Sequence, residues 1–508
     1  MSPVDGARAG RYARSHGLLK DYPDEHSLCI GIDQVSQHRV TSVDHPLLGI
    51  NVLSSRLSRH HALLDDLKQD DIHAEADMLV ELSVANFRSI RERQTLSLVA
   101  SNRYADLGGN LFNPAATGLP QGELLKGAAL YGPNASGKSN ILRALWFMAR
   151  FVATSAVRLP EAPTGVVPFA FDHDCRAAPS ELEALFVVDG VLYQYGYAVD
   201  AAVVHEEYLY AYPSGRRRRW FHRRRQEGGE CTWQTGKTFR LDSAVRAKVR
   251  PDNLLLSVGP QFNDERLLPL HRWFAAAVKF IDLGGGGGPP VHHELGPHFT
   301  AEMIAAGGDK RQAVLRLLAA ADVGVADATV ARRRLPVAAL PMDQLPTALA
   351  EALTRQGAPD ALSIRLRHRG EKGRVFDLEL DQESAGTQRY FQLIGPWLDT
   401  IAAGHVLLVD ELETSLHPVL VRELLRLFFS ARNDSGAQLI FTTHDPLLLD
   451  SGVLRRDQIW FTDRGQDGRT CLYPLSDFKP RNDELLMRGY LSGRYGALPL
   501  VERELEQA

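Results

Sequence analysis

The chain has 508 residues, of which 44% are hydrophobic and 24% are charged, so it can form two or three domains with well-filled cores. A formal net charge of -4 provides no global attraction to nucleic acid, so any such contact must be local. No apolar stretch reaches the roughly 20 residues that span a bilayer, and the four cysteines form no CxxC pair. We therefore expect a cytoplasmic protein without membrane contact, disulfide framework or zinc site.

The first 77 residues differ from the rest of the chain. They contain seven of the 18 histidines and little periodic apolar pattern. An alternating strand pattern then begins abruptly at Met78. We expect residues 1–77 to be either a poorly ordered N-terminal extension or a start-site artefact, with Met78 as the natural first residue.

Residues 132–139 fit the phosphate-loop pattern G-x-x-x-x-G-K-[ST]. Its glycines let backbone N–H groups point at a phosphate, Lys138 adds charge for the β- and γ-phosphates, and Ser139 offers a hydroxyl to Mg²⁺. An apolar run at 127–131 predicts a strand before the loop, and helical spacing over 141–152 predicts a helix after it. We therefore expect ATP and Mg²⁺ as ligands, with nucleotide bound by Gly132, Pro133, Asn134, Ala135, Ser136, Gly137, Lys138, Ser139 and Asn140.

A second apolar run, residues 406–409, ends in two carboxylates and predicts a strand buried on both faces. Asp410 at the strand end can hold Mg²⁺ together with Ser139. Glu411 points differently and can polarise the attacking water as general base.

The next residues complete a βαβ unit, which predicts a parallel sheet. We expect a helix from about His417 to Arg432 and a strand over residues 437–443. His444 then follows a strand end, where its imidazole can hydrogen-bond the γ-phosphate. We count it with Lys138 and Glu411 as catalytic.

The residues from Ser384 to Gln388 open a helix with an apolar face that includes Tyr390 and Trp397. Ser384, Gly386 and the N–H groups of the first turn therefore predict a second anion-binding helix end. One subunit has no need of two anion-binding elements for one γ-phosphate. Two subunits that face head to tail can each contribute one of them. The expected partner is thus a second copy of the chain.

The order of these motifs resembles that of the ABC/SMC-type ATPases, in which the Ser-Gly signature of one subunit closes over nucleotide held by the other. The form Ser384-Ala-Gly-Thr-Gln388 departs from Leu-Ser-Gly-Gly-Gln in the way seen in RloA-like AAA-type ATP-binding proteins of bacteria, often found near restriction and phage-defence genes. The segment Asn86-Phe-Arg-Ser-Ile90 resembles their opening motif. That likeness implies that Arg88, Ser89 and the signature residues Ser384, Gly386 and Gln388 approach nucleotide.

The resemblance covers roughly residues 79–500 and implies an α/β P-loop NTPase of ABC/SMC type. We expect a mostly parallel sheet, an antiparallel β subdomain formed by strands over 183–199 and 206–225, and a helical insert over 298–353. The expected divisions are an extension at 1–77, an N-terminal lobe at 78–283, a flexible glycine run and helical insert at 284–360, and a C-terminal lobe at 361–508.

Two features permit alternative interpretations. Gln194 could be the Mg²⁺-contacting glutamine of ABC-type sites, but its alternating surroundings favour an ordinary strand.

Seven arginines between Arg216 and Arg225 surround Trp220 and Phe221. They could bind DNA or RNA phosphates and stack on bases, but we favour a solvated edge hairpin whose charges discourage strand pairing.

The resemblance implies a soluble ATP-hydrolysing switch that dimerises on ATP and controls a separate effector, such as a nuclease, in phage defence. A repair ATPase of the SMC/RecF sort is one alternative, although no sustained heptads predict a coiled coil. A transporter subunit is disfavoured by the unusual signature, and a non-hydrolysing scaffold is disfavoured because Glu411 and His444 are both present.

Overall fold

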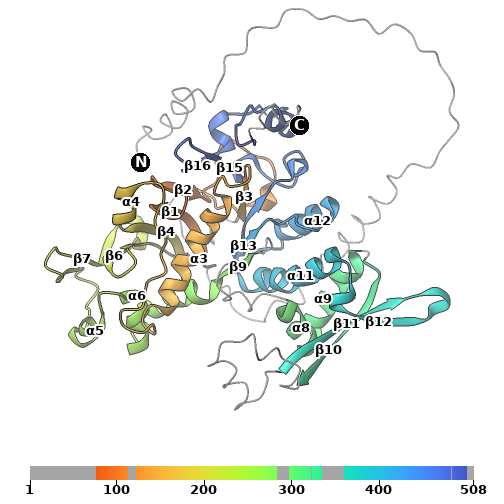
Figure 1. Ribbon diagram of the computed structural model, residues 1–508, viewed down its shortest axis with the longest axis horizontal. Helices are drawn as coiled ribbons and strands as arrows, with labels where there is room; N and C mark the ends of the chain where they lie inside the picture. Colours follow the sequence, from red (N-terminus) through yellow and green to blue (C-terminus); the bar gives the residue numbers. More distant parts are fainter. Residues whose placement is uncertain are drawn as a thin grey trace, which may run out of the picture.

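Three β-sheets organise the protein, and they follow one another from left to lower right in Figure 1. The computed structural model describes residues 76–112, 122–282, 297–321, 323–334, 360–481 and 483–499. The N-terminal extension and the glycine run therefore lie outside the described residues.

The central sheet has six strands in the order β16-β15-β3-β14-β13-β9. All neighbours are parallel except β15 and β16, so the predicted parallel sheet is present. Every residue of β3, β13 and β14 is buried, as expected for strands covered on both faces. The strand bounds are β3 (Gly127–Tyr131), β9 (Val278–Asp282), β13 (Val406–Asp410), β14 (Gln438–Thr443), β15 (Ile459–Arg464) and β16 (Thr470–Pro474).

Helices cover both faces of this sheet, and alternate residues of β13 serve the two faces. Leu408 belongs to the core cluster that contains residues of α3 (Lys138–Thr154), whereas Leu407 belongs to the cluster of α11 (Ala385–Ala403) and α12 (Pro418–Phe428). The helix α12 ends four residues before the expected Arg432. The buried amide of Asn433 donates to the Phe428 carbonyl at 3.1 Å, which satisfies a backbone acceptor at the helix end.

A seven-stranded antiparallel sheet lies beside the central sheet, as the predicted β subdomain requires (Figure 1). In spatial order it contains β2 (Gln94–Ser97), β1 (Met78–Ala85), β4 (Ser180–Val188), β5 (Val191–Val199), β6 (Val204–Ala211), β7 (Arg218–Arg225) and β8 (Cys231–Thr235). The short helices are α4 (His173–Ala177), α5 (Ser243–Lys248), α6 (Leu255–Val258) and α7 (Leu267–Arg272). Because β8 pairs with β7, the arginine-rich strand is not the sheet edge, and that part of the edge-hairpin interpretation is wrong.

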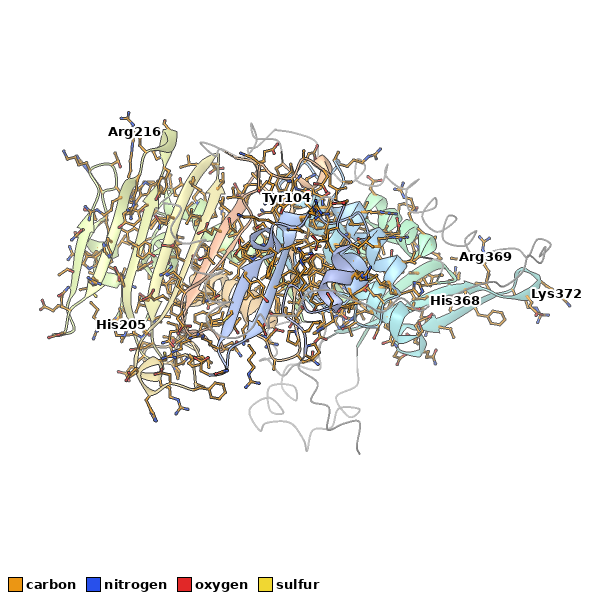
Figure 2. All side chains as sticks on the ribbon, turned by 90° about the horizontal axis from the view of Figure 1, so that it is seen from above. Tyr104, His205, Arg216, His368, Arg369 and Lys372 are labelled. Atoms are coloured by element: carbon orange, nitrogen blue, oxygen red, sulfur yellow. The ribbon has the colours of Figure 1, made fainter. Side chains whose placement is uncertain are left out.

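The expected helical insert is wrong over Val325–Arg334, which is a strand, and its remainder at 335–353 lies outside the described residues. Two helices, α8 (Pro297–Ala306) and α9 (Gly308–Ala320), are followed by a three-stranded antiparallel sheet of β10 (Val325–Arg334), β11 (Asp360–Arg369) and β12 (Val375–Glu379). Pairing with β11 overrides the helical propensity of the Ala- and Arg-rich segment. Since β10 and β11 are partners, the expected division at residue 360 cuts through a sheet. We call the projecting β11–β12 hairpin the arm; Lys372 lies at its tip (Figure 2).

One arginine of the basic cluster holds the antiparallel sheet together from inside. Arg223 on β7 forms an ion pair of 2.8 Å with Glu207 on β6, and their side chains are 2% and 0% exposed. Glu207 also accepts hydrogen bonds from the Tyr195 hydroxyl and from the Leu255 and Leu256 N–H groups. This carboxylate therefore joins three strands to the first turn of α6.

No described helix is long and apolar enough to cross a membrane. Cys175, Cys231 and Cys471 are free thiols. No group of three or more His, Cys, Asp or Glu side chains within the described ranges could hold a metal ion.

Replacing Arg223 with alanine should lower the free energy of unfolding by about 3–5 kcal/mol, because it leaves the Glu207 charge buried without its partner. Arg224→Ala is the matched control: its side chain is 66% exposed and lies 3.7 Å from Glu206, so we expect a change of less than about 1 kcal/mol. Urea unfolding followed by circular dichroism measures both. Equal effects of the two substitutions would contradict a structural role specific to Arg223.

Candidate functional site

The phosphate loop connects β3 to α3 and needs glycine at both ends. Gly132 and Gly137 have φ angles of 155° and 100°. A Cβ atom on Gly132 would lie 2.4 Å from the Thr462 carbonyl oxygen, and one on Gly137 would lie 1.9 Å from the Thr470 hydroxyl. Glycine at these positions thus permits both the backbone conformation and the close approach of the β15–β16 hairpin.

Hydroxyl groups from that hairpin hold the loop in place. The Ser136 and Thr462 hydroxyls are 2.6 Å apart, and the Ser89 and Thr470 hydroxyls are 2.7 Å apart. The Asn140 amide donates to the Ser89 hydroxyl at 2.7 Å. The structure therefore brings Ser89 to the start of α3. The sequence analysis missed both threonines, because no local motif marks residues more than 300 positions away.

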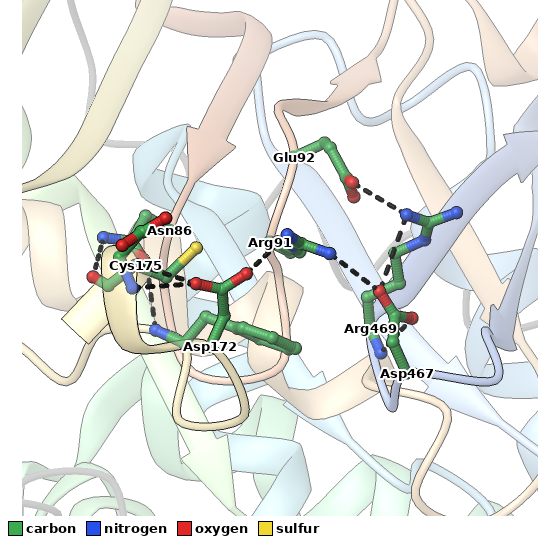
Figure 3. A network of polar contacts seen from close by, with 9 residues as sticks. Asn86, Arg91, Glu92, Asp172, Cys175, Asp467 and Arg469 are labelled. Atoms are coloured by element: carbon green, nitrogen blue, oxygen red, sulfur yellow. Dashed lines mark hydrogen bonds and ion pairs between the residues drawn. The ribbon is translucent and has the colours of Figure 1, made fainter. Parts of the chain in front are cut away.

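A polar network positions the segment that carries Arg88 and Ser89 (Figure 3). The Arg91 guanidinium contacts Asp172 at 2.5 Å and Asp467 at 3.2 Å, and Arg469 contacts Glu92 at 2.8 Å. These pairs attach the segment to the residues before α4 on one side and to the β15–β16 hairpin on the other.

Arg88 itself is exposed and has a φ angle of 52°. Partial burial, together with the neighbouring Arg143, lowers the pKa of its guanidinium. Two like charges close together in this way favour the binding of an anion between or beside them.

Lys138 is buried and folded onto its own loop. Its ammonium donates to the Gly132 and Pro133 carbonyls at 2.8 and 3.0 Å. Burial lowers its pKa to about 8, against the opposing effect of Asp410 and Glu411. A phosphate anion would stabilise the charged form that burial disfavours.

Asp410 accepts two hydroxyl hydrogen bonds on one carboxylate oxygen, from Ser139 at 2.9 Å and from Thr442 at 2.7 Å. Its other oxygen lies 4.0 Å from the Arg143 guanidinium. The Ser139 hydroxyl and the Asp410 carboxylate are hard oxygen donors that converge, so this pair fits the ligand preference of Mg²⁺.

Glu411 has a left-handed backbone with φ of 53°, which is uncommon for a residue with a side chain. Its N–H donates to the Thr442 hydroxyl at 2.7 Å, and its carboxylate accepts from the Thr414 hydroxyl at 3.2 Å. The carboxylates of Glu411 and Asp410 therefore have different hydrogen-bond partners. Backbone strain of this kind is concentrated at functional sites.

His444 is held by a carboxylate that the sequence analysis did not select. Its N–H donates to Glu413 Oε1 at 2.5 Å, while Glu413 Oε2 is buried and has no hydrogen-bond partner among the described residues. Burial and then Lys138 lower the pKa of His444, while Glu411 and Asp410 oppose this effect. At neutral pH the imidazole is therefore uncharged and can donate one hydrogen bond. The electrostatic influence of all three residues on His444 shows that the predicted catalytic groups lie together.

The signature residues occupy a separate place. Ser384 caps α11, its hydroxyl accepting from the Thr387 N–H at 3.1 Å, and the Gln388 amide donates back to the Glu383 carbonyl at 2.8 Å. A Cβ on Gly386 would lie 3.0 Å from the Ser415 carbonyl oxygen. Across the described ranges, no hydrogen bond joins these signature residues to the phosphate loop. Within one copy the two predicted anion-binding elements therefore make no direct hydrogen bond to each other.

Gln194 lies in β5 and uses both ends of its amide within the antiparallel sheet. It donates to Glu183 at 2.8 Å and accepts from the Tyr212 hydroxyl at 2.8 Å. These contacts agree with the strand interpretation and provide no support for a role at Mg²⁺.

Residues 128–241 and 318–450 match a family model described as "AAA domain, putative AbiEii toxin, Type IV TA system". Together with the strand–loop–helix and the parallel strands, this match, which covers just under half of the chain, supports a P-loop ATPase fold. No curated protein matches the sequence significantly.

Solved structures with a distant likeness include an SMC head domain from Thermotoga maritima, with 13% identity and a TM-score of 0.34, covering 78% of this chain and 98% of that one. Another is an SmcHead bound to the C-winged helix domain of ScpA, with 13% identity and a TM-score of 0.37, covering 79% and 99%. A third, an Smc head with an extended coiled coil and a ScpA domain derived from Pyrococcus furiosus, has 12% identity, a TM-score of 0.33 and coverages of 79% and 98%. At such low scores the likeness bears on neither site nor function.

The free protein should bind ATP about tenfold more weakly at pH 9 than at pH 7, because Lys138 with a pKa of about 8 loses its charge in this interval. Below about pH 7 the lysine is almost fully protonated and the affinity should be nearly constant. Lys126→Met is the matched control: it removes another lysine whose pKa burial lowers to about 8, and it should leave the pH profile unchanged. A titration with fluorescent ATP measures the affinity, and a flat profile in the unmodified protein would contradict the assignment.

Glu413→Ala should reduce kcat for ATP hydrolysis by about 10- to 100-fold, because the backbone of His444 loses its acceptor and the imidazole shifts. Nucleotide affinity should change little, because the hydrogen bond of Glu413 is to His444 and not to the phosphate loop. Glu413→Gln retains an acceptor oxygen and should stay close to the unmodified rate. Steady-state hydrolysis and ATP titration together test this; equal loss in both variants would mean that the carboxylate charge matters rather than its placement of His444.

Proposed function

We propose that the protein is an ATP-hydrolysing switch that dimerises head to tail when it binds ATP. The observation that carries the proposal is the pair of separated anion-binding elements. The phosphate loop, Asp410, Glu411 and His444 converge at one place, whereas Ser384 and Gly386 start a helix elsewhere in the same chain. A second copy can supply the missing helix end to each site.

Within one site, each group has a distinct task. The Lys138 ammonium leaves the Gly132 and Pro133 carbonyls to neutralise the β- and γ-phosphates. Ser139 and Asp410 would hold Mg²⁺, which when bound supplies positive charge to the phosphate oxygens. Glu411 removes a proton from water as the water oxygen attacks the γ-phosphorus and the bond to the β–γ bridging oxygen breaks. The neutral imidazole of His444 donates to a γ-phosphate oxygen.

The second subunit completes the site through the N-terminus of its α11. The positive end of the helix dipole and the free N–H groups of the first turn face the γ-phosphate. Glycine at 386 suits the packing of this helix end in its own chain, because a Cβ atom there would lie 3.0 Å from the Ser415 carbonyl oxygen. Loss of the γ-phosphate after hydrolysis removes the anion that both subunits share, and the dimer opens.

The dimer controls a separate effector protein, such as a nuclease, in phage defence. The resemblance of the signature Ser384–Gln388 to RloA-like proteins supports this role. The description of the matched family, which names a toxin of a toxin–antitoxin system, is compatible with it.

Glu411→Gln should bind ATP normally but hydrolyse it at least about 100-fold more slowly, because the general base is lost. The protein should then accumulate as a dimer, detectable by light scattering with ATP and not with ADP. Lys138→Ala should abolish nucleotide binding and remain monomeric. Hydrolysis by Glu411→Gln at the normal rate would contradict the role of this carboxylate.

Mixing two inactive variants tests the shared site. Ser384→Arg should bind ATP as a monomer but fail to hydrolyse it, since the damage falls on the site of the neighbour. A mixture with Lys138→Ala should recover activity, because one of the two composite sites in a heterodimer has an intact loop and an intact signature. No recovery in heterodimers isolated with two different affinity tags would contradict the head-to-tail arrangement.

A further inference from the structure

The turn from β6 to β7 and the first two residues of β7 carry four consecutive arginines, residues 216–219, which we call the arginine turn. All four side chains are exposed. Arg216 lies at the outer end of the antiparallel sheet, away from the arm (Figure 2). The turn is thus accessible from solvent at one extremity of the molecule.

The structure divides the basic cluster into a neutralised part and an uncompensated part. Arg223 is paired with buried Glu207, and Arg224 and His222 both contact Glu206. In contrast, no carboxylate in the described part of the chain forms an ion pair with any arginine of the turn. Adjacent like charges repel one another, so this part of the cluster favours an anionic partner.

Other exposed arginines of this protein do form ion pairs with carboxylates. On the arm, the exposed Arg365 and Arg367 are each paired across the hairpin, with Glu379 at 2.7 Å and with Asp377 at 2.8 Å. Arg365 and Arg367 are therefore neutralised by carboxylates on the facing strand, whereas the four arginines of the turn form no such pair within the described residues.

The partners that the turn does have keep its charge intact. Arg217 lies over the Tyr210 ring at 3.7 Å from the ring centre, and Arg219 donates to the neutral amide of Gln234. These contacts orient two guanidinium groups without neutralising them.

The aromatic residues near the turn are not available for base stacking. One face of Tyr210 is covered by Arg217. Trp220 stacks on Phe239 with 5.4 Å between ring centres and meets Tyr193 edge to face at 5.3 Å. A single strand, which depends on stacking of its unpaired bases, gains little here. A duplex offers closely spaced phosphates and needs no stacking.

We propose that the arginine turn binds the phosphate backbone of double-stranded DNA, without regard to base sequence. The site lies apart from the nucleotide-binding residues and does not depend on the proposed ATP switch. It would place the outer end of the antiparallel sheet of each subunit against the duplex.

The test measures binding of the full chain to a fluorescent DNA duplex of arbitrary sequence by anisotropy. With four phosphate contacts, the affinity should fall about 100-fold between 50 and 200 mM salt. Replacing Arg216, Arg217, Arg218 and Arg219 together with glutamine should abolish both the affinity and its salt dependence. Hydrolysis of ATP should remain at the unmodified rate, which reports that the variant is folded.

Arg365→Gln with Arg367→Gln is the control, since it also removes exposed arginines but from balanced pairs, and binding should be unchanged. If the fourfold variant does not fold, Arg216→Gln with Arg218→Gln replaces it. That pair should weaken duplex binding at 50 mM salt and about halve the slope of log affinity against log salt. Tighter binding of a single strand than of the duplex would overturn the proposal. An equal loss of duplex binding in the arm control would also overturn it. So would binding of an acidic protein at the arginine turn when the duplex does not bind.

Discussion

The carboxylate of Asp410 is the contact on which the geometry of the site depends. One of its oxygens accepts the Ser139 hydroxyl from the start of α3 and the Thr442 hydroxyl from β14, so a single buried group joins the ends of three elements. Thr442 also accepts the Glu411 N–H, which stabilises the left-handed turn that separates the two carboxylates. The residues proposed to bind the metal and to activate water are therefore adjacent and are held by one hydrogen-bond arrangement.

Burial supplies the electrostatic condition for this site. The same low-dielectric surroundings lower the pKa values of Lys138 and His444 and raise the pKa of Glu413. A buried charged group is stabilised by a nearby charge of opposite sign. This site therefore favours a ligand that carries both negative phosphate and positive metal charge. The charges of the buried groups and those of a Mg²⁺–nucleotide complex are therefore complementary.

The two proposed surfaces differ in their chemistry and in their positions. The nucleotide site uses buried groups with well-defined partners, and its second half comes from a helix end that caps itself within one chain. The arginine turn uses exposed groups without compensating carboxylates among the described residues. A buried, directional site suits recognition of one small anion, whereas an exposed array of guanidiniums suits a repeating polyanion.

Elements with local signals could be predicted from the amino-acid sequence. The strand–loop–helix around Lys138, the strand ending at Asp410 and the strand before His444 were predicted because phosphate loops and buried strands carry short patterns in neighbouring residues. The antiparallel strands expected over 183–199 and 206–225 are also present, and so is the helix expected after Ser384.

Only the tertiary structure decided features that depend on distant partners. Thr442, Thr462 and Thr470 contact the site from other strands, and a threonine in a strand has no local mark of such a contact. The segment at 325–334 is a strand because it pairs with residues 360–369, although its composition also suits a helix. Likewise, the seven arginines look alike in the sequence. Folding buries Arg223 against Glu207 and leaves residues 216–219 uncompensated, because charge balance depends on which carboxylates the sheet brings near.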